Sequence, residues 1–183
     1  MISPLTTTMP SDYYAPVENH VYFTSQELAK RNHEVWIACL KGSKIPEGCG
    51  LIEVQDKDEE KAFGIYKETL KQFDVIMDAS SLKYCYLYKH DEKPDLKLIA
   101  LTYPYQGLGY TVSPPLPFPC MVGTSDSMAQ AMSARLGCAF RVVHYFASPI
   151  PNGFEMPKER NGRLLYLGRF EKSKGAQIAV DLA

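Results

Sequence analysis

The chain has 183 residues, enough for one well-packed domain and part of another. With 45% hydrophobic and 22% charged residues, its composition is that of an ordinary globular protein. A formal net charge of −1 disfavours a dedicated nucleic-acid binder, which usually carries a strong basic excess. No apolar run approaches the roughly 18 residues of a membrane-spanning helix. Peripheral contact with a membrane stays open.

The first half of the chain predicts alternating strands and helices. Met1–Leu5 is a very short apolar piece, which would be a strand that starts at the first residue. Apolar residues over about Glu18–Arg31 suit one face of a helix. Three further elements are expected in chain order: a strand in "HEVWIACL" that ends by Gly42, a strand at Leu51–Val54 and a charged helix at about Asp58–Lys71.

The second half continues the alternation. Buried strands are predicted in "FDVIMDA", "KLIALTY", "PCMVGTS" and "FRVVHYF". A helix that ends at Leu136 should separate the last two strands, with Ser125 or Asp126 as its N-cap and Gly137 after its end. Such alternation implies a parallel sheet covered on both faces, a doubly wound, Rossmann-like α/β domain.

We expect three parts along the chain. Residues 1–148 should form the α/β domain, 149–161 a linker rich in proline, glycine and charge, and 162–183 the opening βα unit of a second domain. In "YCYLYK" the tyrosines alternate, and we expect them to pack beneath a loop; the alternative is that they line a ligand cleft.

The cysteines and histidines give little sign of metal or redox chemistry. No CxxC pair and no histidine pair at metal-ligand spacing occurs, so we predict no metal site. We expect reduced thiols that fill the core of a cytoplasmic protein, at Cys39, Cys49, Cys85, Cys120 and Cys138. His33 is placed to favour a helix dipole, and His144, in a strand-like run, is expected in the core.

The stretch "GRFEKSKG" suggests anion binding. Arg169 follows a predicted strand and a glycine, and Lys174 precedes a helix that opens at Gly175. The free N–H groups of a helix N-terminus favour an anion. Two cations converging there would make a diphosphate clamp, with forked contacts from arginine and a point charge from lysine. The alternative is a solvated turn whose charges face water.

Several ordered stretches carry a family signature. They are "YAPVE" at 14–18, "LAKRNHEV" at 28–35, "FDVIMDAS" at 73–80, "VGTSDSMAQAM" at 122–132, "PIPNGFE" at 149–155 and "LLYLGRFEKSKGAQIAVDLA" at 164–183. Together they resemble the retaining glycosyltransferases of family 4, over nearly the whole chain and in that family's order. The resemblance implies the GT-B fold, with two Rossmann-like domains. This chain would hold the N-terminal acceptor-side domain, the interdomain hinge and the start of a donor-binding domain that continues beyond residue 183.

The resemblance also implies an activity: transfer of a sugar from a nucleotide-sugar with retention of configuration, without a metal or other cofactor. Arg169 and Lys174 match the family's contacts to the donor diphosphate. Ala15 and Pro16 occupy loop positions where the family often has two glycines near that diphosphate, and proline lacks an N–H donor. Tyr103 matches a histidine near the transferred sugar, which makes it the candidate catalytic residue, although tyrosine is a poorer proton shuttle near neutral pH.

The acceptor is expected at the carboxyl ends of the strands, where open α/β sheets bind ligands. The loops Tyr13–Glu18 and Thr102–Gly109 should line it, with contacts from Tyr14, Glu18 and Gln106. The expected partners are a nucleotide-sugar and a carbohydrate, lipid-linked or small-molecule acceptor.

Two other interpretations stay open. A non-catalytic α/β binding module with a degenerate glycosyltransferase-like fold is favoured by the residues that depart from the family pattern and disfavoured by Arg169 and Lys174. An oxidoreductase-type Rossmann domain is disfavoured because GxGxxG is missing. Catalysis needs both halves of the enzyme, so we expect this chain alone to be inactive. The lone βα unit of residues 162–183 would also expose strand edges through which two copies could pair as a homodimer.

Overall fold

The structure is a computed structural model that describes residues 1–11, 15–82, 84–101, 121–136, 141–144, 162, 166, 170 and 172–182. The chain divides into two compact units, Met1–Ser148 and Pro149–Ala183. The first unit is α/β, and every strand pair among its described residues is parallel, which confirms the predicted class of fold. No helix in the described ranges is long and apolar enough to cross a membrane.

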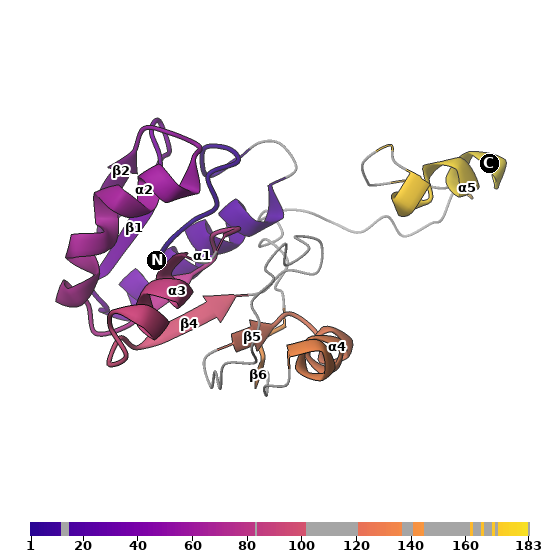
Figure 1. The fold of residues 1–183 in the computed structure, drawn as a ribbon. Helices are drawn as coiled ribbons and strands as arrows, with labels where there is room; N and C mark the ends of the chain where they lie inside the picture. Colours follow the sequence, from indigo (N-terminus) through magenta and orange to yellow (C-terminus); the bar gives the residue numbers. More distant parts are fainter. Residues whose placement is uncertain are drawn as a thin grey trace. The chain divides into compact units, whose positions relative to one another are not determined.

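The first unit alternates strands and helices much as the sequence predicts (Figure 1). Strand β2 begins two residues earlier than predicted, at Cys49, and β3 ends at Asp78 although Ala79 stays buried beyond its end. In chain order the elements are α1 (Pro16–Lys30), β1 (Val35–Leu40), β2 (Cys49–Val54), α2 (Glu59–Tyr66), the 3-10 helix η1 (Lys67–Gln72), β3 (Ile76–Asp78), α3 (Tyr84–Asp91), β4 (Leu98–Leu101), β5 (Met121–Gly123), α4 (Asp126–Leu136) and β6 (Arg141–Val142).

The segment Met1–Ser3 joins two ladders into one sheet. One ladder pairs β1 with β2, and the other has the order β3–β4–β5–β6. Ile2 forms parallel bridges to both Ala38 of β1 and Asp78 of β3. Four backbone hydrogen bonds of 2.8 to 3.0 Å support these bridges: Ile2 N–H to Met77 C=O, Ala79 N–H to Ile2 C=O, Ser3 N–H to Ala38 C=O and Ala38 N–H to Met1 C=O. Among the described residues, the strands therefore lie side by side in the order β2–β1–(Met1–Ser3)–β3–β4–β5–β6.

Two apolar cores lie on opposite faces of this sheet, because successive side chains of a strand point to opposite sides. On β1, Ala38 joins one core while Ile37 and Cys39 join the other. Helices α2 and α3 close the first core, and α1 closes the second, with contributions from Tyr66 of α2, Tyr86 of α3 and Val21 of α1. We call the two sides the α2/α3 face and the α1 face.

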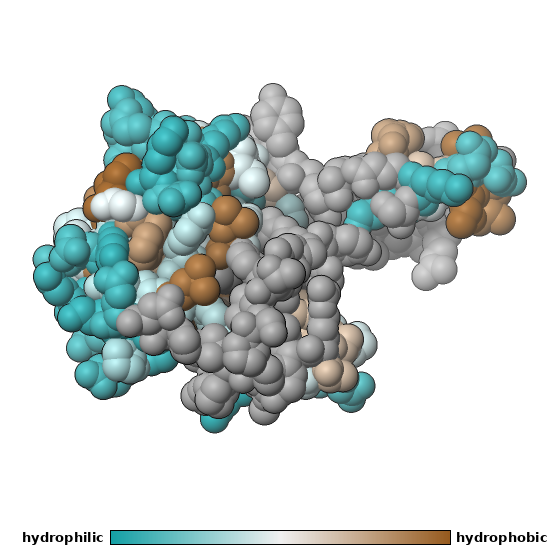
Figure 2. Space-filling view, in the orientation of Figure 1, coloured by the Kyte–Doolittle hydropathy of each residue, from teal (hydrophilic) through white to brown (hydrophobic). Residues whose placement is uncertain are grey.

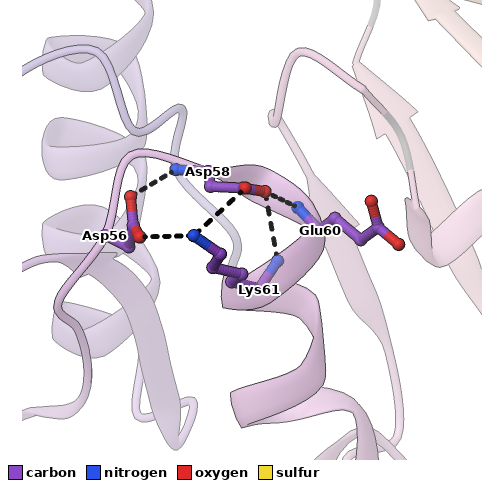
Figure 3. A network of polar contacts seen from close by, with 4 residues as sticks. All are labelled: Asp56, Asp58, Glu60 and Lys61. Carbon is purple, nitrogen blue, oxygen red and sulfur yellow. Dashed lines mark hydrogen bonds and ion pairs between the residues drawn. The ribbon is translucent and has the colours of Figure 1, made fainter.

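Helix α2 begins at a polar network (Figure 3). The Asp58 carboxylate accepts the N–H groups of Glu60 at 3.0 Å and Lys61 at 3.3 Å, as an N-cap residue does. Asp56 accepts the Asp58 N–H at 3.0 Å, and the Lys61 ammonium lies 3.3 Å from Asp56. The Asp58 N–H and the Lys61 ammonium both lower the pKa of the Asp56 carboxyl. The helix predicted near this position is present, and its second part takes the tighter 3-10 form of η1.

Helix α4 begins where the sequence places it. The Ser125 hydroxyl accepts the Met128 N–H at 3.2 Å, so Ser125 rather than Asp126 is the N-cap residue. The helix ends at Leu136 as predicted, and Gly137 lies outside the described residues.

Two expectations differ from the structure. The alternating tyrosines lie on helix α3 and not beneath a loop: Tyr86 and Tyr88 are buried in the core, and the Tyr84 ring stacks on Phe63 with 5.7 Å between centroids. Packing against α2 selects the helix over the strand-like period of two. His144 is not a core residue, because β6 ends at Val142 and the side chain of His144 is 70% exposed.

In the second unit, the described residues form the 3-10 helix η2 (Lys172–Lys174) and α5 (Ala176–Asp181). Gly175 connects them with a φ of 71°, a left-handed conformation that glycine adopts without strain. The helix buries none of its residues, and Figure 2 shows apolar surface on it, where Ile178, Val180 and Leu182 are exposed. So short a helix forms no core of its own. The predicted strand in "RLLYLG" and the hinge lie outside the described residues.

The contribution of the Ile2 side chain to the first core can be tested by comparison with its neighbour Ser3. Ile2→Ala removes an almost completely buried side chain from the first core and should lower the free energy of unfolding by about 2–5 kcal/mol. The buried hydroxyl of Ser3 has no hydrogen-bond partner within the described part of the chain, so Ser3→Ala should be neutral or slightly stabilising. Urea unfolding measures both. Equal effects of the two variants would contradict this role.

Candidate functional site

The candidate site lies where two neighbouring strands send their helices to opposite faces. Met1–Ser3 is followed by α1 on the α1 face, whereas β3 is followed by α3 on the other face. In open parallel sheets, ligands bind outside the carboxyl ends of the strands at such a point. We call residues 4–11, 15–18 and 78–82 the switch-point edge.

A buried carboxylate lies on one side of the switch-point edge. Glu18, in the first turn of α1, is 3% exposed and accepts a hydrogen bond from the Thr6 hydroxyl. The partial positive charge of the helix N-terminus favours a carboxylate at this position. The Thr6 carbonyl accepts from the Lys57 ammonium at 3.0 Å. Thr6 thus connects the start of α1 with the loop after β2.

The loop before α1 is held by its own backbone groups. The Met9 N–H donates to the Ser43 hydroxyl at 3.1 Å, and the Ser11 N–H donates to the Asn19 side chain at 2.9 Å. The Met9 side chain is fully buried in the second core. Both N–H groups therefore donate hydrogen bonds to side chains of the protein itself. Glycine-rich phosphate loops differ, because they leave such groups pointing at the ligand.

Two carboxylates order the loop on the other side of the switch-point edge. Asp78, which ends β3, accepts the N–H of Ser80 at 2.9 Å and its hydroxyl at 2.6 Å. Glu59, the first residue of α2, accepts the Ser81 N–H at 2.7 Å on one oxygen and the Leu82 N–H at 2.5 Å on the other. Both carboxylates are buried. They fix the path of the chain between β3 and α3.

A further polar pair lies at the carboxyl ends of β5 and β6. The Asp126 carboxylate and the His144 imidazole are 4.0 Å apart, with 77% and 70% of their side chains exposed. A pair this exposed contributes little to stability and is strongly screened. It adds polar groups to the edge of the sheet without forming a buried acid–base pair.

Four of the predicted site residues are described: Ala15, Pro16, Glu18 and Lys174. The other four lie outside the described residues: Tyr14, Tyr103, Gln106 and Arg169. Ala15 is the buried N-cap residue of α1 and gives no side-chain cap, and Pro16 takes the first helical position. The structure therefore brings three predicted residues together at the start of α1. In the second unit, Lys174 ends η2, and its carbonyl accepts from the Tyr166 hydroxyl at 3.4 Å.

Sequence reasoning missed the residues that order the loop after β3. An aspartate at the end of a buried strand, followed two residues later by serine, is typical of an Asx-turn and could have indicated Asp78 and Ser80. Glu59 gave no such signal, because the N–H groups it accepts are 22 and 23 residues away.

A buried thiol and a buried imidazole in the described part of the chain are uncharged. Burial raises the pKa of the Cys39 thiol, which keeps it protonated and a poor nucleophile. Burial lowers the pKa of His20, so its imidazole is neutral at physiological pH. In the described part of the chain, no three His, Cys, Asp or Glu side chains form a group that could hold a metal ion. The buried carboxylates of the site bond to the protein's own loops, and the exposed Thr6 offers a hydroxyl and a carbonyl that suit a polar ligand.

The sequence matches no protein-family model and no curated protein. The function is therefore inferred from the residues and the fold.

The order of the loop after β3 should depend on Glu59. Glu59→Gln leaves one acceptor oxygen for two N–H groups and should lower the free energy of unfolding by about 1.5–3 kcal/mol. The matched control is Glu60→Gln, because the Glu60 side chain points away from the polar network of Figure 3 and is exposed. It should change stability by less than about 0.5 kcal/mol. Thermal or urea unfolding distinguishes the two, and similar losses would exclude the assigned role.

Proposed function

We propose that this chain carries the acceptor-side domain of a retaining GT-B glycosyltransferase, followed by the hinge and the first part of the donor-binding domain. The proposal assigns residues 1–148 to a doubly wound, Rossmann-like domain, 149–161 to the hinge and 162–183 to the donor side. The observation that carries it is the strand order, with Met1–Ser3 between β1 and β3 and the following helices on opposite faces. This order supports a ligand site where the sequence resemblance expects the acceptor.

In the proposed reaction, the bond between the sugar C1 and the donor diphosphate breaks, the oxygen of an acceptor hydroxyl forms the new bond on the same face of the sugar, and the proton of that hydroxyl passes to the departing diphosphate. Arg169 and Lys174 stabilise the charge of the departing nucleoside diphosphate. Tyr103 donates or accepts a hydrogen bond at a hydroxyl of the transferred sugar. The chain needs no metal for these roles, because its own cations neutralise the leaving group.

In the proposed acceptor site, Glu18 acts indirectly, by holding Thr6 in position. The Glu18 carboxylate is buried and accepts from the Thr6 hydroxyl, so in this structure it contacts the loop and not solvent. We assign it the positioning of Thr6, whose hydroxyl and carbonyl lie at the switch-point edge. On the loop after β3, the Ser80 hydroxyl is buried and donates to Asp78, so it orders that side of the switch-point edge.

A second candidate function is a non-catalytic α/β binding module. The observation that favours it is that the Met9 and Ser11 N–H groups already have partners and that Pro16 has no N–H. These three positions cannot donate a backbone hydrogen bond to a diphosphate as a glycine-rich loop does. A module of this kind would bind a carbohydrate or related ligand without nucleotide-sugar turnover.

Ligand mapping by nuclear magnetic resonance tests the acceptor site. In titrations of the ¹⁵N-labelled chain with mono- and oligosaccharides, we expect the amide shifts to concentrate at Thr6, Glu18 and Ser80. Glu18→Gln should weaken binding at least fivefold, since it replaces a charge-assisted hydrogen bond by a neutral one. Glu27→Gln, on the same helix but paired with Lys30 at 2.6 Å, is the control. Shifts that map away from the switch-point edge would refute the proposed acceptor site.

Nucleotide-sugar assays separate the two candidate functions. The 183-residue chain should release no nucleoside diphosphate above background, because the reacting groups need both domains for their positions. In a longer protein with the complete donor domain, Lys174→Ala should weaken nucleotide-sugar binding by about 1.5–3 kcal/mol. Lys172→Ala, in the same 3-10 turn, should leave it unchanged. Equal binding by both variants would favour the binding module.

A further inference from the structure

Helices cover the α1 face of the sheet unevenly. Helix α1 packs against β1 and β2 on this face, whereas α2 and α3 lie on the other. Helix α4 also lies on the α2/α3 face. Val122 of β5 points into the second core, so its neighbour Gly123 faces the opposite side of the sheet. A Cβ added at Gly123 would lie 3.2 Å from Ala129 of α4, which places α4 on that side. Among the described helices, none covers the α1 face of β4, β5 and β6.

The handedness of the connections accounts for this arrangement. Crossovers between parallel strands are right-handed, so the direction of each connection across the sheet decides which face it takes. Helices α2, α3 and α4 belong to connections that run toward β6, and they share the α2/α3 face. Helix α1 and the loop after β1 run toward β2, and Ile45 of that loop packs in the second core. Among the described connections, none crosses β4 to β6 on the α1 face.

A hollow of about 810 Å³ lies on this part of the α1 face, which none of the described helices covers. Its floor and one wall are apolar, formed by Met77, Ile99, Leu101 and Val122 of the strands and by Phe23 and Leu28 of α1. Its volume is in the range of sites for small molecules, which are likewise mostly apolar with a few polar groups.

The rim of the hollow carries positive charge. Arg31 follows the end of α1, Arg141 begins β6, and neither forms an ion pair with a described carboxylate. Glu27 also lies at the rim, but the Lys30 ammonium, 2.6 Å away, offsets its charge. His20 is buried at the hollow and lacks a charge near neutral pH. Two arginines therefore stand beside an apolar floor.

We propose that this hollow binds a single-chain amphiphile with an anionic head group. The alkyl chain lies along the strand residues of the floor, and the head group contacts Arg31 and Arg141. Burying alkyl groups against an apolar floor is favourable in proportion to the area removed from water, and arginine forms forked hydrogen bonds with carboxylates and phosphates. This inference is independent of the proposed transferase activity, because the described lining of the hollow shares no residue with the switch-point edge.

Calorimetric titration with alkyl phosphates tests the proposal. Dodecyl phosphate, used below its micelle concentration, should bind at least tenfold more tightly than hexyl phosphate, and inorganic phosphate should not bind measurably. Amide shifts should concentrate at Ile99, Leu101 and Val122. The double variant Arg31→Gln/Arg141→Gln should weaken dodecyl phosphate binding at least tenfold, whereas Lys71→Gln, an exposed cation on η1, should have no effect.

A second variant tests the hollow without changing its charge. Thr24→Trp, on the α1 wall, places a large side chain in the hollow and should abolish binding while the circular dichroism spectrum is unchanged. Several results would overturn the proposal: no binding of dodecyl phosphate, equal binding of inorganic phosphate, equal binding of an acidic peptide without alkyl groups, or undiminished binding by the double variant. A ligand-free dimer that Thr24→Trp dissociates would instead assign the hollow to a second copy of the chain.

Discussion

Four backbone hydrogen bonds of Met1–Ser3 hold this fold together. They pair a three-residue segment with β1 on one side and β3 on the other, at 2.8 to 3.0 Å. Without them, the described strands would form two separate ladders, of two and four strands. Ile2 also adds its side chain to the core under α2 and α3. The sheet therefore depends on a segment that joins the two ladders through its backbone and adds side chains to the cores on both faces.

The position of Met1–Ser3 in the sheet also determines where the switch-point edge lies. Because Met1–Ser3 lies between β1 and β3, the helices that follow it and β3 leave on opposite faces, and their loops meet at one edge. Buried carboxylates on both sides of this edge, Glu18 and Asp78, accept hydrogen bonds from hydroxyl and amide groups of the loops. Buried charge is costly without such partners. The described residues of these loops are therefore held in place by the protein itself, which limits the entropy that binding must cost.

The sequence predicted the elements with strong apolar patterns and missed those that depend on distant partners. "VWIACL" reads as a buried strand from its composition, and Ser125 precedes a helical pattern as a cap should. Met1–Leu5 is too short to show a period, and only pairing with β1 and β3 reveals its place. Tyr84, Tyr86 and Tyr88 alternate as in a strand, but packing against Phe63 and the rest of α2 selects a helix. Of the candidate site, the sequence indicated Glu18 but not Glu59, whose partners lie in another loop.

Native-state hydrogen exchange tests the central role of Met1–Ser3 most directly. Exchange of the amides of Ser3, Ala38 and Ala79, followed in increasing urea, reports whether the two ladders open together. If the segment unites the sheet, these amides exchange with one common free energy, equal to that of the most protected amides of β1 and β3. If the Ser3 amide exchanges freely while Ala38 and Ala79 are protected with different free energies, the two ladders are independent and the account of the sheet is wrong.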